Sequence, residues 1–130
     1  MALVLLDTTV LIDVLRGRPA GQRLVQLRTG RDQPATTAIN VEEIVRGVRV
    51  AEEAAVARLF DGLLLLDVGR REAERAGAWR RKHAAAGRTL AQADCLIAAC
   101  AATAGARLAT GNPKDFPMLG DAVEHWPVGA

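Results

Sequence analysis

The chain has 130 residues, half of them apolar, and a formal net charge of +2, which suits one domain with a single core that needs no disulfide. Aromatic residues make up only 3% of the chain and tyrosine is absent, which disfavours an aromatic stacking platform for single-stranded RNA. The positive side chains are nearly all arginine, which suits binding to phosphates or carboxylates. Composition alone does not distinguish a nucleic acid from an acidic protein as the partner.

The segment LVLLDTTVLID, residues 3–13, runs from four apolar residues into Asp7. Such a run predicts a buried strand, and an acid after it lies at the rim of the sheet, where ligands of open α/β sheets bind. From Thr8 the apolar spacing predicts a helix that stops at Gly17, with the Thr8 and Thr9 hydroxyls available either to cap it or to place a metal-bound water. Asp13 is interpreted as an ordinary surface or capping acid.

The same N-terminal segment has no basic stretch, and two aspartates interrupt its apolar run. We therefore expect neither a signal peptide nor a membrane span, and take the cytoplasm as the location. An amphipathic helix is predicted from Pro19 to Gly30 with Leu24, Val25 and Leu27 facing inward.

A loop is expected after Gly30, followed by a short strand from Ala35 to Ile39 and a helix, capped by Asn40, that runs to about Val48. Two adjacent glutamates start this helix. Glu42 has Arg46 four residues on, the spacing of a surface ion pair, whereas Glu43 has Gly47, so Glu43 is the candidate site residue. The alternative for Glu43 is a capping box with Asn40.

A further helical pattern ends at Gly62, and residues 63–66 predict a third buried strand. Asp67, which follows, is left out of the site because it could equally cap the next helix. Residues 70–86 predict a long helix rich in arginine. Its basic residues from Arg70 to Lys82 form either a solvated face or a surface that steers RNA.

The segment LAQADCLIAACAATAG predicts a helix that is apolar nearly all round, with Asp94 as its one charge. A buried carboxylate needs a partner, an opening or a metal. The alternatives to a site role are an ion pair with Arg88 or Arg107, or a cap at the helix start. Cys95 and Cys100 on this helix suit a reducing compartment as small buried hydrophobes.

A fourth strand is predicted over residues 107–109, and the loop TGNPKDF leaves its carboxyl end, so Asp115 is expected at the same rim as Asp7. Asp115 could instead cap a turn with Asn112. A last strand near Val123 and Glu124 would close the edge of the sheet. The whole chain, residues 1–130, is expected to form one domain.

Four acids converging on one rim would repel one another unless a cation joined them. Mg²⁺ and Mn²⁺ prefer oxygen ligands, and such ions polarise a scissile phosphate and supply hydroxide. Other phosphate chemistries fail on details: a haloacid-dehalogenase-type site needs an aspartate where Thr9 stands, and the loop before Lys114 lacks the sequence of a P-loop. No glycine-rich dinucleotide fingerprint follows the first strand.

The segments LLDTTVLIDVLRG, VEEIVRG, ADCLIAA and LATGNPKDF resemble, in order and spacing, the successive blocks of PIN-domain ribonucleases, specifically the VapC-type toxins. The resemblance implies a three-layer α/β/α fold with a central, mainly parallel sheet of four to five strands. It also implies Mg²⁺- or Mn²⁺-dependent endoribonuclease activity on RNA, inhibition by a cognate VapB-type antitoxin, and homodimerisation.

The resemblance places Asp7, Glu43, Asp94 and Asp115 on the family's acidic positions, with Asp7, Asp94 and Asp115 as metal ligands. It places Thr9 and Thr110 on polar positions near the metal. The fourth acid is the family's most variable. A different class of function is a non-catalytic PIN-like module that binds protein or RNA. A DNA nuclease of the related flap-endonuclease type is disfavoured because the chain lacks room for DNA-clamping additions.

Overall fold

The computed structural model describes residues 2–129 and is organised around a five-stranded sheet in which every neighbouring pair of strands is parallel. The strand order is β3-β2-β1-β4-β5. The strands are β1 (Leu3–Leu6), β2 (Gln33–Thr37), β3 (Leu64–Leu66), β4 (Arg107–Thr110) and β5 (Val123–His125). The α/β prediction with a central parallel sheet is therefore confirmed, and β5 closes one edge as expected.

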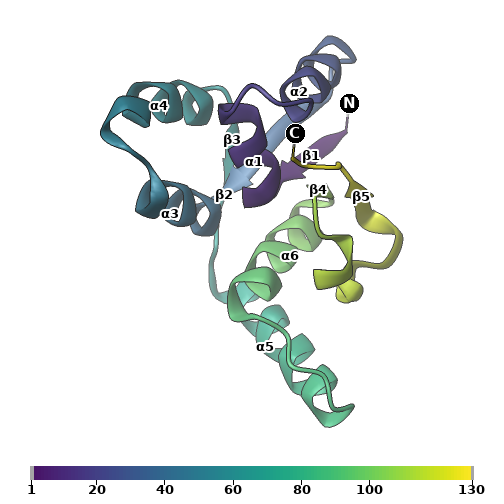
Figure 1. Ribbon diagram of the computed structural model, residues 1–130. Helices are drawn as coiled ribbons and strands as arrows, with labels where there is room; N and C mark the ends of the chain where they lie inside the picture. The colour runs from purple at the N-terminus through teal and green to yellow at the C-terminus, as the bar shows by residue number, and fades with distance from the viewer. Residues whose placement is uncertain (1, 130) are drawn as a thin grey trace.

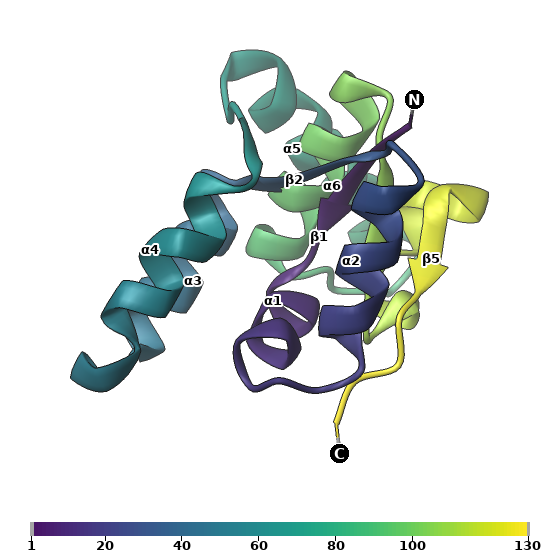
Figure 2. The same cartoon turned by 90° about the horizontal axis from the view of Figure 1, so that it is seen from above.

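Helices cover both faces of the sheet, so the molecule has three layers (Figures 1 and 2). The α-helices are α1 (Thr8–Leu15), α2 (Ala20–Thr29), α3 (Ala38–Gly47), α4 (Glu53–Asp61), α5 (Arg70–Ala85) and α6 (Gln92–Ala104). The short 3-10 helices are η1 (Val50–Glu52), η2 (Pro113–Asp115) and η3 (Pro117–Ala122). Within residues 2–129, every helix is too short or too polar to cross a membrane.

Alternate residues of β1 point into two halves of the core. Val4 and Leu6 pack in a cluster with α1, α2 and the inner residues of α3 and α4, while Leu5 packs in a cluster with α6 and β4. Helix α6 can lie directly on the sheet because its buried residues are mostly small. This burial on both faces explains why β1 reads as an unbroken apolar run.

The helix after β2 begins earlier than the sequence indicates. Its N-cap is Thr37, not Asn40, because Thr37 has extended backbone angles and its Oγ1 accepts a hydrogen bond from the Asn40 backbone nitrogen at 3.3 Å. The strand is displaced with it: β2 already includes Pro34, which pairs with Val4. The predicted strand over 35–39 was therefore placed two residues too late, and the predicted helix cap at Asn40 three residues too late.

Two predictions of burial were also wrong. Leu64 and Leu65 are 47% and 53% exposed, because β3 is an edge strand and not a central one. Val25, expected to face inward from α2, is 61% exposed, whereas Leu24 beside it is buried. An apolar run does not distinguish a central strand from an edge strand, and neighbouring residues of a helix, such as Leu24 and Val25, are turned about 100° from one another.

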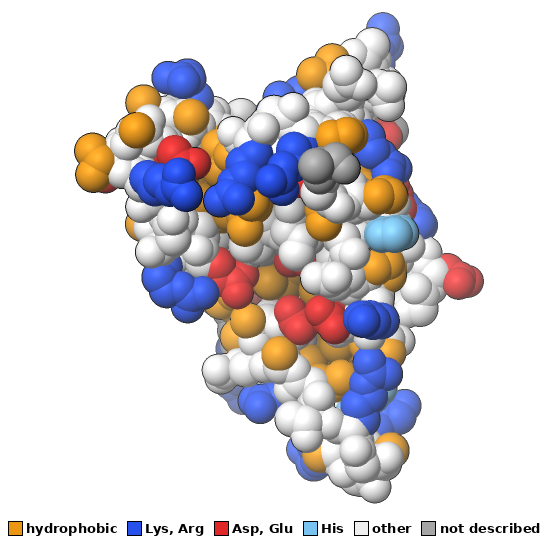
Figure 3. All heavy atoms as spheres, viewed as in Figure 1, with side chains coloured by type: hydrophobic (Ala, Val, Ile, Leu, Met, Phe, Trp, Pro, Cys, Tyr) orange, Lys and Arg blue, Asp and Glu red, His pale blue; other side chains and the backbone are white. Residues whose placement is uncertain are grey.

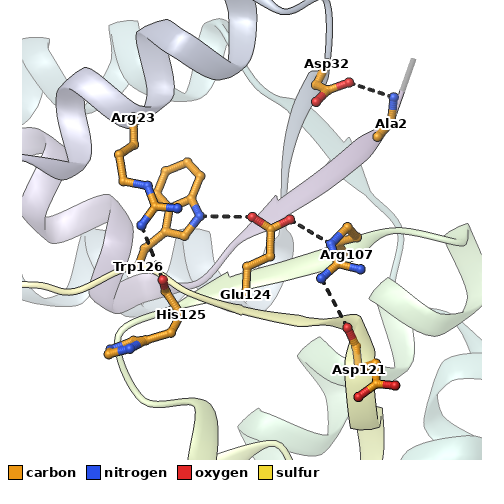
Figure 4. A network of polar contacts seen from close by, with 8 residues as sticks. All are labelled: Ala2, Arg23, Asp32, Arg107, Asp121, Glu124, His125 and Trp126. Atoms are coloured by element: carbon orange, nitrogen blue, oxygen red, sulfur yellow. Dashed lines mark hydrogen bonds and ion pairs between the residues drawn. The ribbon is translucent and has the colours of Figure 1, made fainter.

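The segment after β5 is fixed to the edge of the sheet by a polar network (Figure 4). Trp126 is buried, and the Arg23 guanidinium lies 4.6 Å from the centre of its ring. The Glu124 carboxylate accepts hydrogen bonds from Trp126 Nε1 at 3.3 Å and from Arg107 Nε at 2.7 Å. Cys95 and Cys100 are both buried and free, as predicted.

Candidate active site

The strand order places β1 and β4 side by side, although their connections leave in opposite directions. From β1 the chain moves to β2 and β3 on one side, and it later returns to β4 and β5 on the other. Such a switch point leaves a crevice at the carboxyl ends of the two central strands, where α/β proteins bind ligands. Asp7 follows β1 and Thr110 ends β4, so both stand at this crevice.

Asp7 is held at the crevice by neutral donors. Its backbone nitrogen donates to the Ala109 oxygen at 2.9 Å, and its Oδ2 accepts from the Thr110 hydroxyl at 2.8 Å and from the Thr9 hydroxyl at 3.4 Å. Asp7 is the N-cap residue of α1, yet its side chain makes no capping hydrogen bond. Burial raises the pKa of Asp7 above its usual value, and the nearby Glu43 charge acts in the same direction.

Glu43 reaches the crevice from the second turn of α3. Its Oε1 accepts a hydrogen bond from the Thr8 hydroxyl at 2.6 Å. The capping-box alternative for Glu43 was wrong, because that box is made by Thr37 and Asn40. Glu42, by contrast, is exposed and forms a 4.0 Å ion pair with Arg46 on the surface. This is the surface ion pair that the spacing of Glu42 and Arg46 predicts.

Asp94 lies half-buried in the first turn of α6. Burial, together with the negative charges of Asp7, Asp115 and Glu43, raises its pKa to about 6. Neither predicted ion-pair partner is used, since Arg88 donates to the Lys114 oxygen and Arg107 binds Glu124. Neither alternative ion pair therefore accounts for the charge of Asp94.

Asp115 stands at the end of η2, in the loop that leaves β4, and is exposed. Its backbone nitrogen donates to the Asn112 oxygen at 3.0 Å, so the turn is closed by the backbone. The loop is also supported from the α5–α6 connection by the 2.7 Å hydrogen bond from Arg88 to the Lys114 oxygen. The negative charge of Asp115 is among those that raise the pKa of Asp94.

In the part of the chain that the structure describes, no lysine or arginine forms an ion pair with any of these four carboxylates. Within residues 2–129 there is also no preformed group of three or more acidic, histidine or cysteine side chains at metal-binding distances. The donor set nevertheless fits a hard cation, because Mg²⁺ commonly uses one or two carboxylates and keeps several waters. Carboxylate and hydroxyl oxygens are the ligand types it prefers.

The surrounding surface is mixed in charge. Figure 3 shows acidic side chains gathered near the middle of one face, with lysine and arginine side chains around them.

Asp13 does not join the acids. The prediction of a surface residue was wrong, because Asp13 is fully buried and its Oδ1 accepts hydrogen bonds from Arg18 at 3.4 Å and from the Gly129 nitrogen at 3.0 Å.

The sequence interpretation missed the supporting role of Asn40. Its amide nitrogen donates to the Thr8 hydroxyl at 3.0 Å, so it lies directly behind the Thr8–Glu43 contact. Asn40 was interpreted only as a helix cap. A signal was present in its position three residues before Glu43, since these positions lie on nearly the same face of a helix.

Comparison with known proteins shows the family to which the chain belongs. The PIN domain family matches residues 4–120. Ribonuclease VapC19 of Mycobacterium tuberculosis is 34% identical over 118 residues, which are 90% of this chain and 94% of that protein.

Solved structures show the same fold. A toxin-antitoxin complex from Klebsiella pneumoniae contains a chain with a TM-score of 0.78 and 27% identity, with 98% of this chain and 99% of that one covered. VapBC2 from Rickettsia felis, bound to a promoter DNA fragment, has a TM-score of 0.82 at 19% identity, with 95% and 98% covered. With its parallel sheet and its acids at the switch point, the chain belongs to the PIN-domain family and, within it, to the VapC type.

Proposed function

We propose that this protein is a Mg²⁺- or Mn²⁺-dependent endoribonuclease that acts in the cytoplasm as the toxin of a toxin-antitoxin pair. The observation that carries the proposal is a set of acids near the carboxyl end of β1: Asp7 follows this strand, and Glu43 contacts the neighbouring Thr8. The charges of Asp7, Asp115 and Glu43 all raise the pKa of Asp94. The relatives named ribonuclease and the neighbours solved as toxin-antitoxin complexes support it.

In this proposal Asp7, Asp94 and Asp115 hold the cation, and the Thr9 and Thr110 hydroxyls orient Asp7. Glu43 orients the attacking water and accepts its proton. A bound divalent ion supplies charge neutralisation for the scissile phosphate and lowers the pKa of a bound water. The arginines of α5, together with Arg88 and Lys114, provide positive charge that attracts RNA.

We further propose that a VapB-type antitoxin docks beside Glu43. A pocket of about 80 Å³ opens there between α1, α3 and α4, lined by Glu43 and by apolar side chains that include Ile12, Val48 and Val56. An apolar segment of the antitoxin fills this pocket, and a basic side chain next to it takes the place of the cation. If excess Mg²⁺ or Mn²⁺ never competes with the antitoxin, this arrangement is wrong.

Cleavage assays with purified protein test the nuclease proposal. RNA and DNA of the same sequence are incubated with the parent and with Asp7→Asn, in Mn²⁺ and in EDTA. We expect RNA to be cut only by the parent with Mn²⁺, because the variant loses a carboxylate at the centre of the site. Equal cleavage by Asp7→Asn, or cleavage of DNA alone, contradicts the proposal. Sedimentation of the same preparations tests the proposed homodimer.

A further inference from the structure

A chain of buried polar side chains links the start of α3 to the start of α1 and ends at Glu43. Thr37 and Asn40 are both 0% exposed. The Thr37 hydroxyl donates to Asn40 Oδ1 at 2.7 Å, the Asn40 amide nitrogen donates to Thr8 Oγ1 at 3.0 Å, and the Thr8 hydroxyl donates to Glu43 Oε1 at 2.6 Å. Helices α1 and α3, which are distant in sequence, are thereby joined.

The direction of each hydrogen bond follows from what each group can donate. The Thr37 backbone nitrogen lies 3.3 Å from the Asn40 side chain, and a backbone N–H can only donate, so it must face the carbonyl oxygen of that amide. The amide NH₂ of Asn40 must then face Thr8. Since the Thr8 oxygen accepts from Asn40, its single proton is left for Glu43.

We propose that Asn40 and Thr8 are positioning residues that aim Glu43 into the crevice. One carboxylate oxygen is held by Thr8, and the other is left free to accept a hydrogen bond from a water. The proposal rests on the proposed function only for the chemistry that Glu43 performs. The orientation of Glu43 itself follows from the contacts.

Helix capping alone does not account for this arrangement. The capping box needs only Thr37 and the Asn40 oxygen, whereas the Asn40 amide reaches a residue on another helix. Buried polar networks are costly unless every member is satisfied, and Thr8 supplies the acceptor that the buried Asn40 amide nitrogen requires. Thr36, next to Thr37, has a buried hydroxyl with no partner among residues 2–129, so it offers a matched comparison.

Thr8→Val and Asn40→Asp test the proposal. Valine keeps the shape of Thr8 and removes its hydroxyl, and aspartate keeps the capping oxygen of Asn40 and removes its NH₂ donor. We expect each to lower kcat for RNA cleavage roughly ten- to a hundredfold with KM unchanged, the cost of a small displacement of a reacting group. Thr8→Ser should rescue kcat, and the control Thr36→Val should match the parent.

The Glu43→Gln background shows whether the loss acts through Glu43. We expect Thr8→Val to have no added effect on kcat there, because residues that act as a unit are not additive. An equal fold-loss in both backgrounds overturns the proposal. So does full activity of both Thr8→Val and Asn40→Asp.

A measurement that does not use activity separates this proposal from the proposed function. The ¹³C signal of the Glu43 carboxyl group is identified by its loss in Glu43→Gln. We expect it to move in Thr8→Val and Asn40→Asp, and to stay in place in Thr8→Ser and Thr36→Val. If the parent cuts no RNA, the proposed function fails, and this signal still decides the positioning role. An unmoved signal in both Thr8→Val and Asn40→Asp overturns it.

Discussion

The carboxylates at the crevice and the Glu124 carboxylate on the edge strand β5 accept hydrogen bonds from different kinds of donor. At the crevice, Asp7 and Glu43 accept hydrogen bonds from threonine hydroxyls, which orient a carboxylate without cancelling its charge. At the β5 edge, Glu124 pairs with the Arg107 guanidinium (Figure 4). Neutral donors leave the charge of a carboxylate in place, whereas the Arg107 guanidinium brings an opposite charge to Glu124.

The largest expected effect is the loss of RNA cleavage when one negative charge is removed at the crevice, and the same change at the β5 edge is its control. Asp94→Asn should lower RNA cleavage by about a thousandfold or more, roughly 4 kcal/mol of transition-state stabilisation, because the site loses one of the three carboxylates proposed to hold the cation. Glu124→Gln is the matched control and should stay within about twofold of the parent. Initial rates in Mn²⁺ measure both, and circular dichroism checks their folding. Similar losses in the two variants would remove the distinction between the crevice and the β5 edge.

Trp126→Ala tests whether the residues at the β5 edge stabilise the fold without taking part in RNA cleavage. Trp126 is 3% exposed and packs in the cluster formed by α1, α2 and β1, so its truncation should cost about 3 kcal/mol of unfolding free energy. Urea unfolding measures this loss, and Val50→Ala, at a side chain that is 84% exposed, should stay within about 0.5 kcal/mol of the parent. Below its unfolding midpoint, Trp126→Ala should still cut RNA. Loss of cleavage in a folded sample would tie the edge to the site.

The pH dependence of stability sharpens the comparison further. The pKa of Asp94 is raised from 3.8 to about 6, so the folded state binds its proton more tightly than the unfolded state does. This contribution to stability is fully present below about pH 4 and is lost as the pH rises to about 6. The burial that raises the pKa of Asp7 acts in the same sense.

In EDTA, the Tm of Asp94→Asn minus that of the parent should therefore grow by a few degrees between pH 4 and pH 6 and then stay constant. Adding Mn²⁺ at pH 7 should reduce this difference, because the ion stabilises the parent more. Scanning calorimetry measures both. A difference that is constant from pH 4 to pH 8 would mean that the acids do not crowd one another.

The sequence indicated the acidic residues of the candidate site, but it did not indicate all of the neutral side chains that donate hydrogen bonds behind them. Asp7 follows β1, Asp94 lies in the first turn of α6 and Asp115 lies in the loop after β4, so their places in the chain follow from where strands end and helices start. Asn40 was missed as a support because a capping role is local, whereas its bond to Thr8 joins residues 32 positions apart. Asp13 was misjudged in part for the same reason, since one of its two partners, Gly129, is 116 residues away.

The smallest expected effect concerns the ion pair at the β5 edge. Arg107 and Glu124 are 46% and 32% exposed at their side chains, so water and salt screen their attraction. A double-mutant cycle with Arg107→Gln and Glu124→Gln should give a coupling energy below about 1 kcal/mol, falling in 1 M salt. A coupling of several kcal/mol would mean that the pair acts as a buried one. A small coupling energy would mean that the packing of Trp126, rather than the Arg107–Glu124 ion pair, stabilises the β5 edge of the sheet.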